Sequence, residues 1–350
     1  MILKTISLSN FRNFKQQTYL FSPKLTIIVG ENAKGKTNLL EAIYFISTGY
    51  GFRETKEEEL ILVGKILLNA EGAFDINNND RQKFQIILRK QKDSIARFFL
   101  INRAKKKLSI YQSETTKAIL FSPEQIAIIT GSPEKRRIYI DKILCFYDLD
   151  YKNKLNNLEK ALYKRNKLFV YCKDNIKLKE ELKFWNKYLE EQAEYITKKR
   201  QDYISFLNKN NLIDKREFYV EYVKNELTQK KLEKLFEKEI RYKRTLIGPQ
   251  KDDFIIYQKK KGKQNKDLSK FGSRSEQRLG IFWLKLNEIK FYEKNYNKKP
   301  ILLLDDIFSE LDKNNRKLIL NVISKYQTII TMTDKGLLKY CKGEKVIIDL

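Results

Sequence analysis

The chain has 350 residues, of which 42% are hydrophobic and 12% aromatic, so it is long and apolar enough to fold into two or three lobes. Lysine and arginine number 71 against 44 aspartates and glutamates, and a net charge of +27 favours polyanionic partners such as nucleic acid, although Lys, Asn, Ile and Tyr are abundant throughout. The lack of histidine excludes histidine-based catalysis and the usual zinc sites. The sequence shows no leader, no paired cysteines and no apolar run of about 20 residues, which predicts a soluble cytoplasmic protein without a membrane span.

The first third of the chain is dominated by strand patterns. Residues 2–8 and 17–21 have the spacing of two strands joined by a polar turn, SNFRNF. Three further β-patterned runs lie between about 66 and 111. The run 96–101 is followed by Asn102, Arg103 and the basic cluster Lys105–Lys107, which mark the expected tip of a hairpin. A solvated turn explains those lysines as well as a phosphate contact does.

Between these β regions lies a glycine-containing loop. Residues 25–29 are apolar, as expected of a buried strand, and the loop after them matches GxxxxGK[ST] before a helix with apolar residues at 39, 40, 43 and 46. Strand, loop and helix in this order predict a phosphate-binding loop. The predicted nucleotide-binding residues are Gly30, Glu31, Asn32, Ala33, Lys34, Gly35, Lys36, Thr37 and Asn38.

Each fixed residue of this loop has a physical task. Gly30 and Gly35 let successive backbone N–H groups turn inward, and the start of the helix adds positive potential for phosphate oxygens. Lys36 is expected to reach the terminal phosphates, and Thr37 to place its hydroxyl on Mg²⁺. We therefore expect a nucleotide such as ATP, with Mg²⁺, to bind here.

Helical spacing dominates from about 123 to 240. Apolar residues on one face between 155 and 169, and again between 182 and 207, predict two antiparallel helices connected by the polar stretch 173–181. They are too short for a long coiled-coil arm. FYVEYV at 218–223 could be a strand, KKKGK at 259–263 is expected to be a basic hairpin loop, and a helix is expected from about 275 to 292.

Four apolar residues, 301–304, precede Asp305 and Asp306, which is the pattern of a buried strand that delivers carboxylates at its end, the Walker B motif. Asp305 is expected to hold Mg²⁺, and Asp306 to orient or deprotonate the attacking water, with Lys36 as the third catalytic residue. Most of the chain separates Lys36 from Asp305, so something large is inserted between the two motifs.

This separation predicts an α/β fold in which both ends of the chain build one P-loop ATPase head of the ABC or SMC type, with an inserted helical second lobe and no long coiled coil. The expected domains are the N-terminal part of the head at 1–122, helical lobe II at 123–240, and the C-terminal part of the head at 241–350. TIITM at 328–332 is expected to be a second buried parallel strand of the head.

Two further segments fit such a head. SELD contains Ser309 and Asp312 at the place of the D-loop, which in an ATP-bound dimer meets the partner's site. FGSRSEQR precedes a helix at the place of the ABC signature, where a helix N-terminus can grip the γ-phosphate held by a second copy. An N-capped helix start alone would explain the same residues. The predicted signature residues, acting in trans, are Ser273, Arg274, Ser275, Glu276 and Gln277.

With these motifs in order, the chain resembles the RecF family of bacterial recombination and repair ATPases over essentially its whole length. The resemblance rests on ISLSNFRNF, GENAKGKTNLLEAIYF, STGYGFRETKEEELI, FSPEQIAIITGSPEKRRIYID at 121–141, IGPQKDD at 247–253 and LLLDDIFSELD. It implies ATP-dependent homodimerisation, binding of double-stranded, single-stranded and gapped DNA, and slow, DNA-stimulated ATP hydrolysis used as a switch. It further implies that the chain acts with RecO and RecR in recombinational repair and replication-fork maintenance, helping to load recombinase.

The chain departs from the family pattern at Ser275, where the signature usually has glycine. Asp306 stands where ABC transporters have glutamate, and Thr331–Thr333 stands where they have the switch histidine, so slow hydrolysis is expected. By analogy with SMC heads, Arg53 is either a γ-phosphate or dimer contact or a surface arginine. The alternatives to a DNA-binding ATPase are an SMC-like nuclease or chromosome-associated ATPase, a nucleotide kinase, and an interaction protein with a vestigial nucleotide site.

Overall fold

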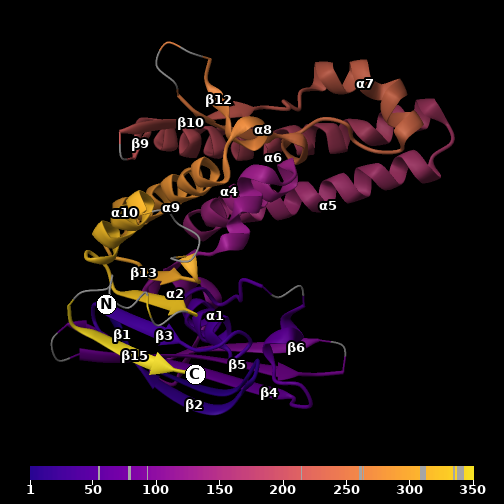
Figure 1. The fold of residues 1–350 in the computed structure, drawn as a ribbon. Coiled ribbons are helices and arrows are strands. Elements are labelled where there is room, and N and C mark those ends of the chain that lie inside the picture. Colours follow the sequence, from indigo (N-terminus) through magenta and orange to yellow (C-terminus); the bar gives the residue numbers. More distant parts are fainter. Residues whose placement is uncertain are drawn as a thin grey trace. The chain divides into compact units, whose positions relative to one another are not determined.

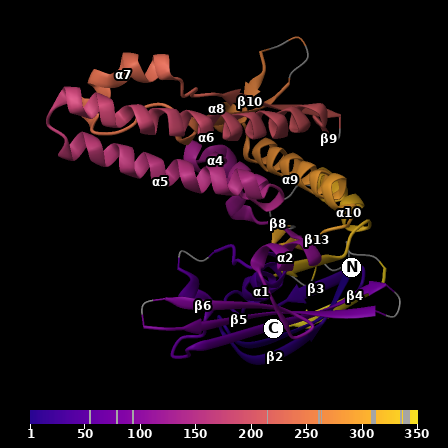
Figure 2. The ribbon, with the colours of Figure 1, turned by 180° about the vertical axis from the view of Figure 1, so that it is seen from behind.

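A computed structural model describes residues 1–53, 56–77, 80–92, 94–213, 215–259, 262, 264–307, 313–333, 336 and 343–350. The chain forms two compact units, the first made of residues 1–124 and 288–350 and the second of residues 125–287. Figures 1 and 2 show the ribbon from opposite sides. Both ends of the chain therefore belong to the same unit.

The second boundary differs from the one expected from the sequence. Residues 241–287, which we expected in the head, belong to the second unit. The reason is that β11 (Asp253–Gln258) pairs antiparallel with β10 (Arg216–Val223), so the chain after 240 completes a sheet that begins before it. The boundary falls inside one helix, α9 (Arg274–Tyr296).

The first unit contains a five-stranded parallel sheet. Its strands, in spatial order, are β15 (Lys345–Asp349), β3 (Leu25–Val29), β14 (Thr328–Met332), β13 (Ile301–Leu304) and β8 (Ala118–Phe121). The last four are buried along their whole length, which explains why their sequences are mostly apolar. Because parallel strands end at the same edge, the segments after β3, β13 and β14 meet there.

The same unit contains an antiparallel sheet. Its strands, in spatial order, are β2 (Phe14–Leu20), β1 (Ile2–Phe11), β4 (Leu67–Asn77), β5 (Asp80–Lys90), β6 (Ile95–Ile101) and β7 (Ala104–Lys106). The hairpin tip expected near 102 is present as Asn102 and Arg103, both with positive φ. Helix α1 (Lys36–Thr48) packs against strands of both sheets, and its apolar residues join a core that includes Phe84 and Leu303.

Shorter elements complete the first unit. They are η1 (Glu57–Leu60), α2 (Leu108–Glu114) and α10 (Lys313–Ile323), and η2 (Pro123–Ile126) leads into the second unit. The buried Tyr111 of α2 donates a hydrogen bond from its hydroxyl to the carbonyl of Ile46 (2.8 Å), which ties α2 to the end of α1.

The second unit is mostly helical. Its helices are α3 (Ala127–Thr130), α4 (Pro133–Tyr147), α5 (Leu149–Tyr171), α6 (Asn175–Lys209), α7 (Gln229–Tyr242), η3 (Pro249–Lys251), α8 (Leu268–Phe271) and the first part of α9. Its antiparallel sheet has the order β12 (Lys266–Asp267), β11, β10 and β9 (Leu212–Ile213). The two antiparallel helices expected from the sequence are α5 and α6, which form the long hairpin visible in Figure 1.

The connection between these helices is shorter than expected. We expected it at 173–181, but α6 already begins at Asn175. The side chain of Asp174 accepts hydrogen bonds from the backbone N–H groups of Ile176 (2.8 Å) and Lys177 (3.4 Å), so it caps the helix. The polar residues after it lie on an exposed face of α6 and do not interrupt the helix.

A buried arginine joins two of the segments on which the family resemblance rests. Arg200 of α6 is 1% exposed, and its guanidinium donates to Asp141 (2.9 Å), to Asp252 (2.8 Å) and to the carbonyl of Pro249 (2.7 Å). Burial alone would lower the pKa of Arg200, but Asp141, Tyr151 and Asp252 raise it. Residues of the segments 121–141 and 247–253 therefore bind the same buried guanidinium, that of Arg200, inside the second unit.

Among the residues that the model describes, no helix is long and apolar enough to cross a membrane.

Candidate functional site

The predicted phosphate-binding loop joins β3 to α1 in the first unit. Its backbone takes left-handed values at Ala33 (φ 67°) and Gly35 (φ 103°), and α1 begins directly after Gly35. A Cβ atom on Gly30 would lie 2.7 Å from the carbonyl oxygen of Leu350, and one on Gly35 would lie 2.7 Å from Nδ2 of Asn13. Gly30 is thus required by a close backbone neighbour, and Gly35 by its left-handed conformation.

Lys36 is the first residue of α1, and it is only 7% exposed. Its Nζ donates hydrogen bonds to the carbonyls of Gly30 (2.7 Å) and Glu31 (2.8 Å), so the ammonium lies over the first residues of the loop. Glu31, Asn32, Ala33 and Lys34 are exposed. This leaves the curve of the loop open to a ligand, with a buried positive charge at one side of it.

The next residue, Thr37, reaches across the parallel sheet to the predicted Walker B strand. Its Oγ1 donates to Oδ1 of Asp305 (3.1 Å), directly after β13. Thr331 of the intervening strand β14 donates from its Oγ1 to the same carboxylate oxygen (2.8 Å). The hydroxyl of Thr331 also accepts a hydrogen bond from the backbone N–H of Asp306 (2.9 Å), whose φ is 45°. The sequence motifs are therefore together in space, as predicted, and Thr331 connects them.

The oxygen atoms of this group suit a magnesium ion. Mg²⁺ binds hard oxygen ligands and usually takes one or two from the protein, with the rest from phosphate and water. Thr37 and Asp305 present a hydroxyl and a carboxylate within 3.1 Å of one another at the mouth of the loop. The residues present fit the predicted metal.

A second group of side chains is hydrogen-bonded together at the start of α1, and of its members only Asn38 and Arg53 were expected from the sequence. Glu41 of α1 is fully buried, and its carboxylate accepts from Nε of Arg12 (2.8 Å), from Nη2 of Arg53 (3.1 Å) and from the backbone N–H of Arg53 (3.0 Å). Burial alone would raise the pKa of Glu41, but the hydrogen bond and charge of Arg12, with those of Arg53, lower it. Arg53 also donates to Oδ1 of Asn38.

Asn38 in turn donates from Nδ2 to Oδ1 of Asn13 (2.7 Å), the residue that closes over Gly35. Arg53 is therefore not a plain surface arginine, and its expected contact with the γ-phosphate or a second copy stays a prediction. It orders the start of α1 together with Arg12. A buried glutamate one turn after the GKT residues was the signal that could have pointed to these two arginines.

The predicted signature lies in the second unit, at the start of α9. Ser273 and Glu276 form a reciprocal cap, because Oε2 of Glu276 accepts from the backbone N–H of Ser273 (2.9 Å) and Oγ of Ser273 accepts from the backbone N–H of Glu276 (3.3 Å). Burial would raise the pKa of Glu276, but Lys266 (2.6 Å) and Ser273 lower it to about 2. Arg274 and Ser275 are exposed, and the buried Gln277 donates to the carbonyl of Leu268 (2.9 Å).

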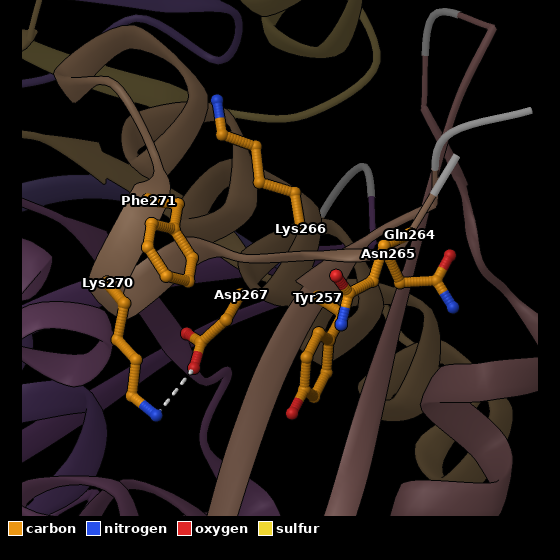
Figure 3. Close-up of a pocket in the computed structure, with 7 residues that line it drawn as sticks. All are labelled: Tyr257, Gln264, Asn265, Lys266, Asp267, Lys270 and Phe271. Atoms are coloured by element: carbon orange, nitrogen blue, oxygen red, sulfur yellow. Dashed lines mark ion pairs between the residues drawn. The ribbon is translucent and has the colours of Figure 1, made fainter.

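A cavity of about 670 Å³ lies beside this helix start, and Figure 3 shows its lining. Asp267 and Lys270 pair across 3.8 Å, while the ammonium of Lys266 points away from the ring of Tyr257. Phe271 is 69% exposed at the rim. The cavity contains none of the predicted phosphate-binding residues, so it is distinct from the predicted nucleotide site of the first unit.

The predicted D-loop residues Ser309 and Asp312 lie outside the described residues. The predicted basic hairpin loop at 259–263 also lies largely outside them, since only 259 and 262 are described.

Residues 2–347 match the family described as RecF/RecN/SMC N terminal domain. The DNA replication and repair protein RecF of Agathobacter rectalis is 33% identical over 98% of this chain and 94% of that protein. RecF of Lachnoclostridium phytofermentans is 33% identical over 95% of this chain and 93% of that protein.

Solved structures of RecF resemble this chain as well. The recombination mediator protein RecF with ATP in the RecFOR pathway has a TM-score of 0.80 and 29% identity, covering 95% of this chain and 94% of that one, and the form with ATPrS has a TM-score of 0.85 and 29% identity, covering 99% and 97%. The Smc head domain of Pyrococcus furiosus, at 19% identity over 97% of this chain and 91% of that one, has a TM-score of 0.52 and shares the fold. The predicted fold class, an α/β head of the SMC type with a helical lobe and no long coiled coil, is confirmed, and the chain belongs to the RecF family.

Proposed function

We propose that the chain is an ATP-dependent DNA-binding protein of recombinational repair and replication-fork maintenance, in which ATP joins two copies. The observation that carries this proposal is the contact of Thr37 and Thr331 with Asp305, which brings the loop and the acids to one edge of the sheet. The RecF relatives are named DNA replication and repair proteins, and RecF structures with ATP and ATPrS resemble this chain over nearly its full length.

In the proposed site the backbone N–H groups of residues 30–38 bind the phosphates, and Lys36 moves from its two carbonyl partners to the terminal phosphates. Thr37 and Asp305 hold Mg²⁺, which, when bound, neutralises charge on the phosphate oxygens. Asp306 accepts a proton from a water molecule as the water oxygen bonds to the γ-phosphorus and the bond between that phosphorus and the bridging oxygen of ADP breaks. The hydrogen bond from its backbone to Thr331 supports this placement of Asp306.

In the proposed dimer, the signature of the second copy, Ser273 to Gln277, contacts the γ-phosphate. Ser309 and Asp312 of the second copy lie at the interface between the two copies. The reciprocal cap between Ser273 and Glu276 supports this role, because it holds the first turn of α9 in a fixed shape with Ser275 exposed on it. Serine in place of glycine at 275 and aspartate at 306 favour slow hydrolysis. ATP then acts as a switch between separate and joined heads, and DNA stimulates its hydrolysis.

The proposed polyanion is DNA, double-stranded, single-stranded or gapped, and a net charge of +27 supports this choice. The place of RecF in the RecFOR pathway supports RecR and RecO as partners in loading recombinase. Within the described residues there is no group of three or more Cys, Asp or Glu side chains that could hold a metal on their own, so no observation favours the nuclease alternative.

The test is the molar mass of the chain, measured by light scattering with and without ATP and Mg²⁺, on gapped and on blunt duplex DNA. We expect the mass to double with ATP and the DNA to be bound by the joined form. An unchanged mass while ATP is demonstrably bound would overturn the proposed joining of two copies.

A further inference from the structure

Helix α5 carries a run of lysines and tyrosines that begins directly after the exposed Glu159 and contains no acid of its own. Residues 160–173, KALYKRNKLFVYCK, contain neither aspartate nor glutamate. Tyr163 is 62% exposed and Tyr171 is 75% exposed, and the lysines between and before them are exposed as well. We call this surface the α5 stripe, and it consists of Lys160, Tyr163, Lys164, Lys167 and Tyr171.

The opposite side of the helix is fixed inside the second unit. Arg165 is 1% exposed, and its guanidinium donates to Asn186 (2.9 Å), Thr245 (2.8 Å) and Glu239 (2.7 Å). Phe169 is buried against apolar side chains of α6. The α5 stripe is therefore held on a fixed element, with its own side chains exposed.

In the stripe, ammonium groups lie beside aromatic rings. Nζ of Lys167 is 4.5 Å from the ring centroid of Tyr163, and Nζ of Lys164 is 5.4 Å from that of Trp185 on α6. Phe184 continues the aromatic surface next to Trp185 and is 64% exposed. Within the described part of the chain, Lys160, Lys164 and Lys167 form no ion pair, so their charge is not neutralised by a neighbouring carboxylate.

Helix α7 shows that this arrangement is not a general property of the basic helices. It also exposes three lysines at a spacing of four, Lys230, Lys234 and Lys238, but Glu233 and Glu237 lie between them. None of these lysines lies beside a ring in the way that Lys167 does, and the acids reduce the local field. The two helices therefore provide a test surface and a matched control within one unit.

We propose that the α5 stripe binds single-stranded DNA, an inference that rests on the DNA binding proposed above and names the surface for it. Lysines bind phosphates, and exposed rings stack on unpaired bases, a combination that recurs where proteins hold single strands. A duplex hides the faces of its bases, so the rings favour the single strand. The α5 stripe therefore binds unpaired nucleotides, with its lysines on the phosphate backbone and its rings on the bases.

The experiment measures binding of the full chain to fluorescent oligothymidylate and to the duplex of the same length, by anisotropy over a range of salt concentrations. The first variant combines Lys160→Gln, Lys164→Gln and Lys167→Gln, and its control combines Lys230→Gln, Lys234→Gln and Lys238→Gln. The second variant combines Tyr163→Leu and Tyr171→Leu, with Tyr163→Phe and Tyr171→Phe as the control that keeps the rings. ATP-dependent doubling of the mass shows that each variant is folded.

We expect the α5 lysine variant to bind the single strand at least about tenfold more weakly, with the log-log salt slope smaller by about 2, since each phosphate contact contributes about 0.7. The α7 variant should change the affinity and the slope much less. The leucine variant should weaken single-strand binding at least about fivefold and leave duplex binding unchanged, while the phenylalanine variant binds as the unmodified chain does.

Equal effects of the two lysine variants, or a leucine variant that binds the single strand normally, would overturn the assignment of the stripe. Equal losses for single strand and duplex in the leucine variant would make the stripe a duplex surface, which also contradicts the proposal. If the unmodified chain bound neither probe, the proposed DNA binding itself would fail. The two failures are therefore distinguishable.

Discussion

Thr331 and Asp305 lie at the ends of neighbouring parallel strands, and the hydroxyl of Thr331 donates a 2.8 Å hydrogen bond to the Asp305 carboxylate. The same hydroxyl accepts from the backbone N–H of Asp306. One side chain thus fixes both acids of the predicted site. Its hydroxyl, which threonine shares with serine and valine lacks, is the basis of the first prediction.

Thr331→Val should remove both hydrogen bonds while keeping the shape of the side chain. We expect ATP turnover to fall at least about fivefold, because an unpaired polar group near the site costs about 1–3 kcal/mol. ATP affinity should fall much less, since the loop residues are untouched. Steady-state turnover and nucleotide binding measure the two effects, and Thr331→Ser, which keeps the hydroxyl, should behave nearly as the original chain.

Lys36→Ala should abolish ATP binding and ATP-dependent joining of two copies, because it removes the buried ammonium of the loop. Basal DNA affinity should be mostly kept, since other basic residues supply it. Equilibrium binding of a fluorescent ATP analogue measures the loss. Lys34→Ala, at an exposed position of the same loop, is the matched control and should bind nucleotide. Turnover at the original rate in the Lys36 variant would refute the assignment of the phosphate loop.

Asp306→Asn should bind ATP but hydrolyse it at least about a hundredfold more slowly, because an amide does not accept the proton of the attacking water. The joined form should therefore accumulate, which size-exclusion chromatography with ATP detects. A variant that hydrolyses ATP normally would show that another group acts as the base.

Ser275→Arg should prevent two copies from joining while it spares nucleotide binding. The exposed position on the first turn of α9 admits the larger side chain within one copy, but its bulk and charge would obstruct a second. Sedimentation velocity with ATP measures the mass, and Ser275→Ala should still join. If the arginine variant dimerised normally with ATP, the signature would not lie at the dimer interface.

Glu41→Gln should destabilise the first unit by about 3 kcal/mol at neutral pH, because it leaves Arg12 beside a neutral group at a buried site. The pKa of Glu41 is lower in the folded chain than its ordinary value of 4.5, so the charged carboxylate favours folding above that value. This stabilisation is lost as the pH falls through the folded pKa. Urea unfolding should therefore show a difference between variant and original chain that is full at pH 7 and shrinks below pH 4.5.

The control for this prediction is Glu58→Gln. Glu58 pairs with Lys90 at the exposed surface, so its replacement should change the unfolding midpoint little. A Glu41 variant whose midpoint matches that of the Glu58 variant at pH 7 would contradict the structural importance of the buried carboxylate.

The local motifs of the site could be read from the sequence because they are contiguous. The loop from Gly30 to Thr37 and the strand before Asp305 each combine a strand pattern with fixed polar residues, and the structure brings Thr37 to Asp305. The bridging role of Thr331 could not be read in this way, because it depends on β14 lying between β3 and β13. Strand order is a property of the whole sheet.

The errors in the fold have similar causes. Residues 241–287 lie in the second unit because β11 pairs with β10, and a short strand pattern does not reveal its partner. The helix connection was expected too far along the chain because lysines and glutamates suggested a loop, although Asp174 caps a helix in which those residues are exposed. The start of this helix is therefore set by its capping residue and not by the polarity of the residues that follow it.

The pairing of Arg200 with Asp141 and Asp252 also restricts how this chain can change over evolutionary time. Removing one partner of a buried charge costs about 3–5 kcal/mol, whereas replacing the whole group with well-packed apolar residues can cost nothing. Single substitutions here are therefore selected against, while joint replacement is tolerated. Related chains should either keep all three residues or have exchanged them together, so these positions should co-vary although they lie far apart in the sequence.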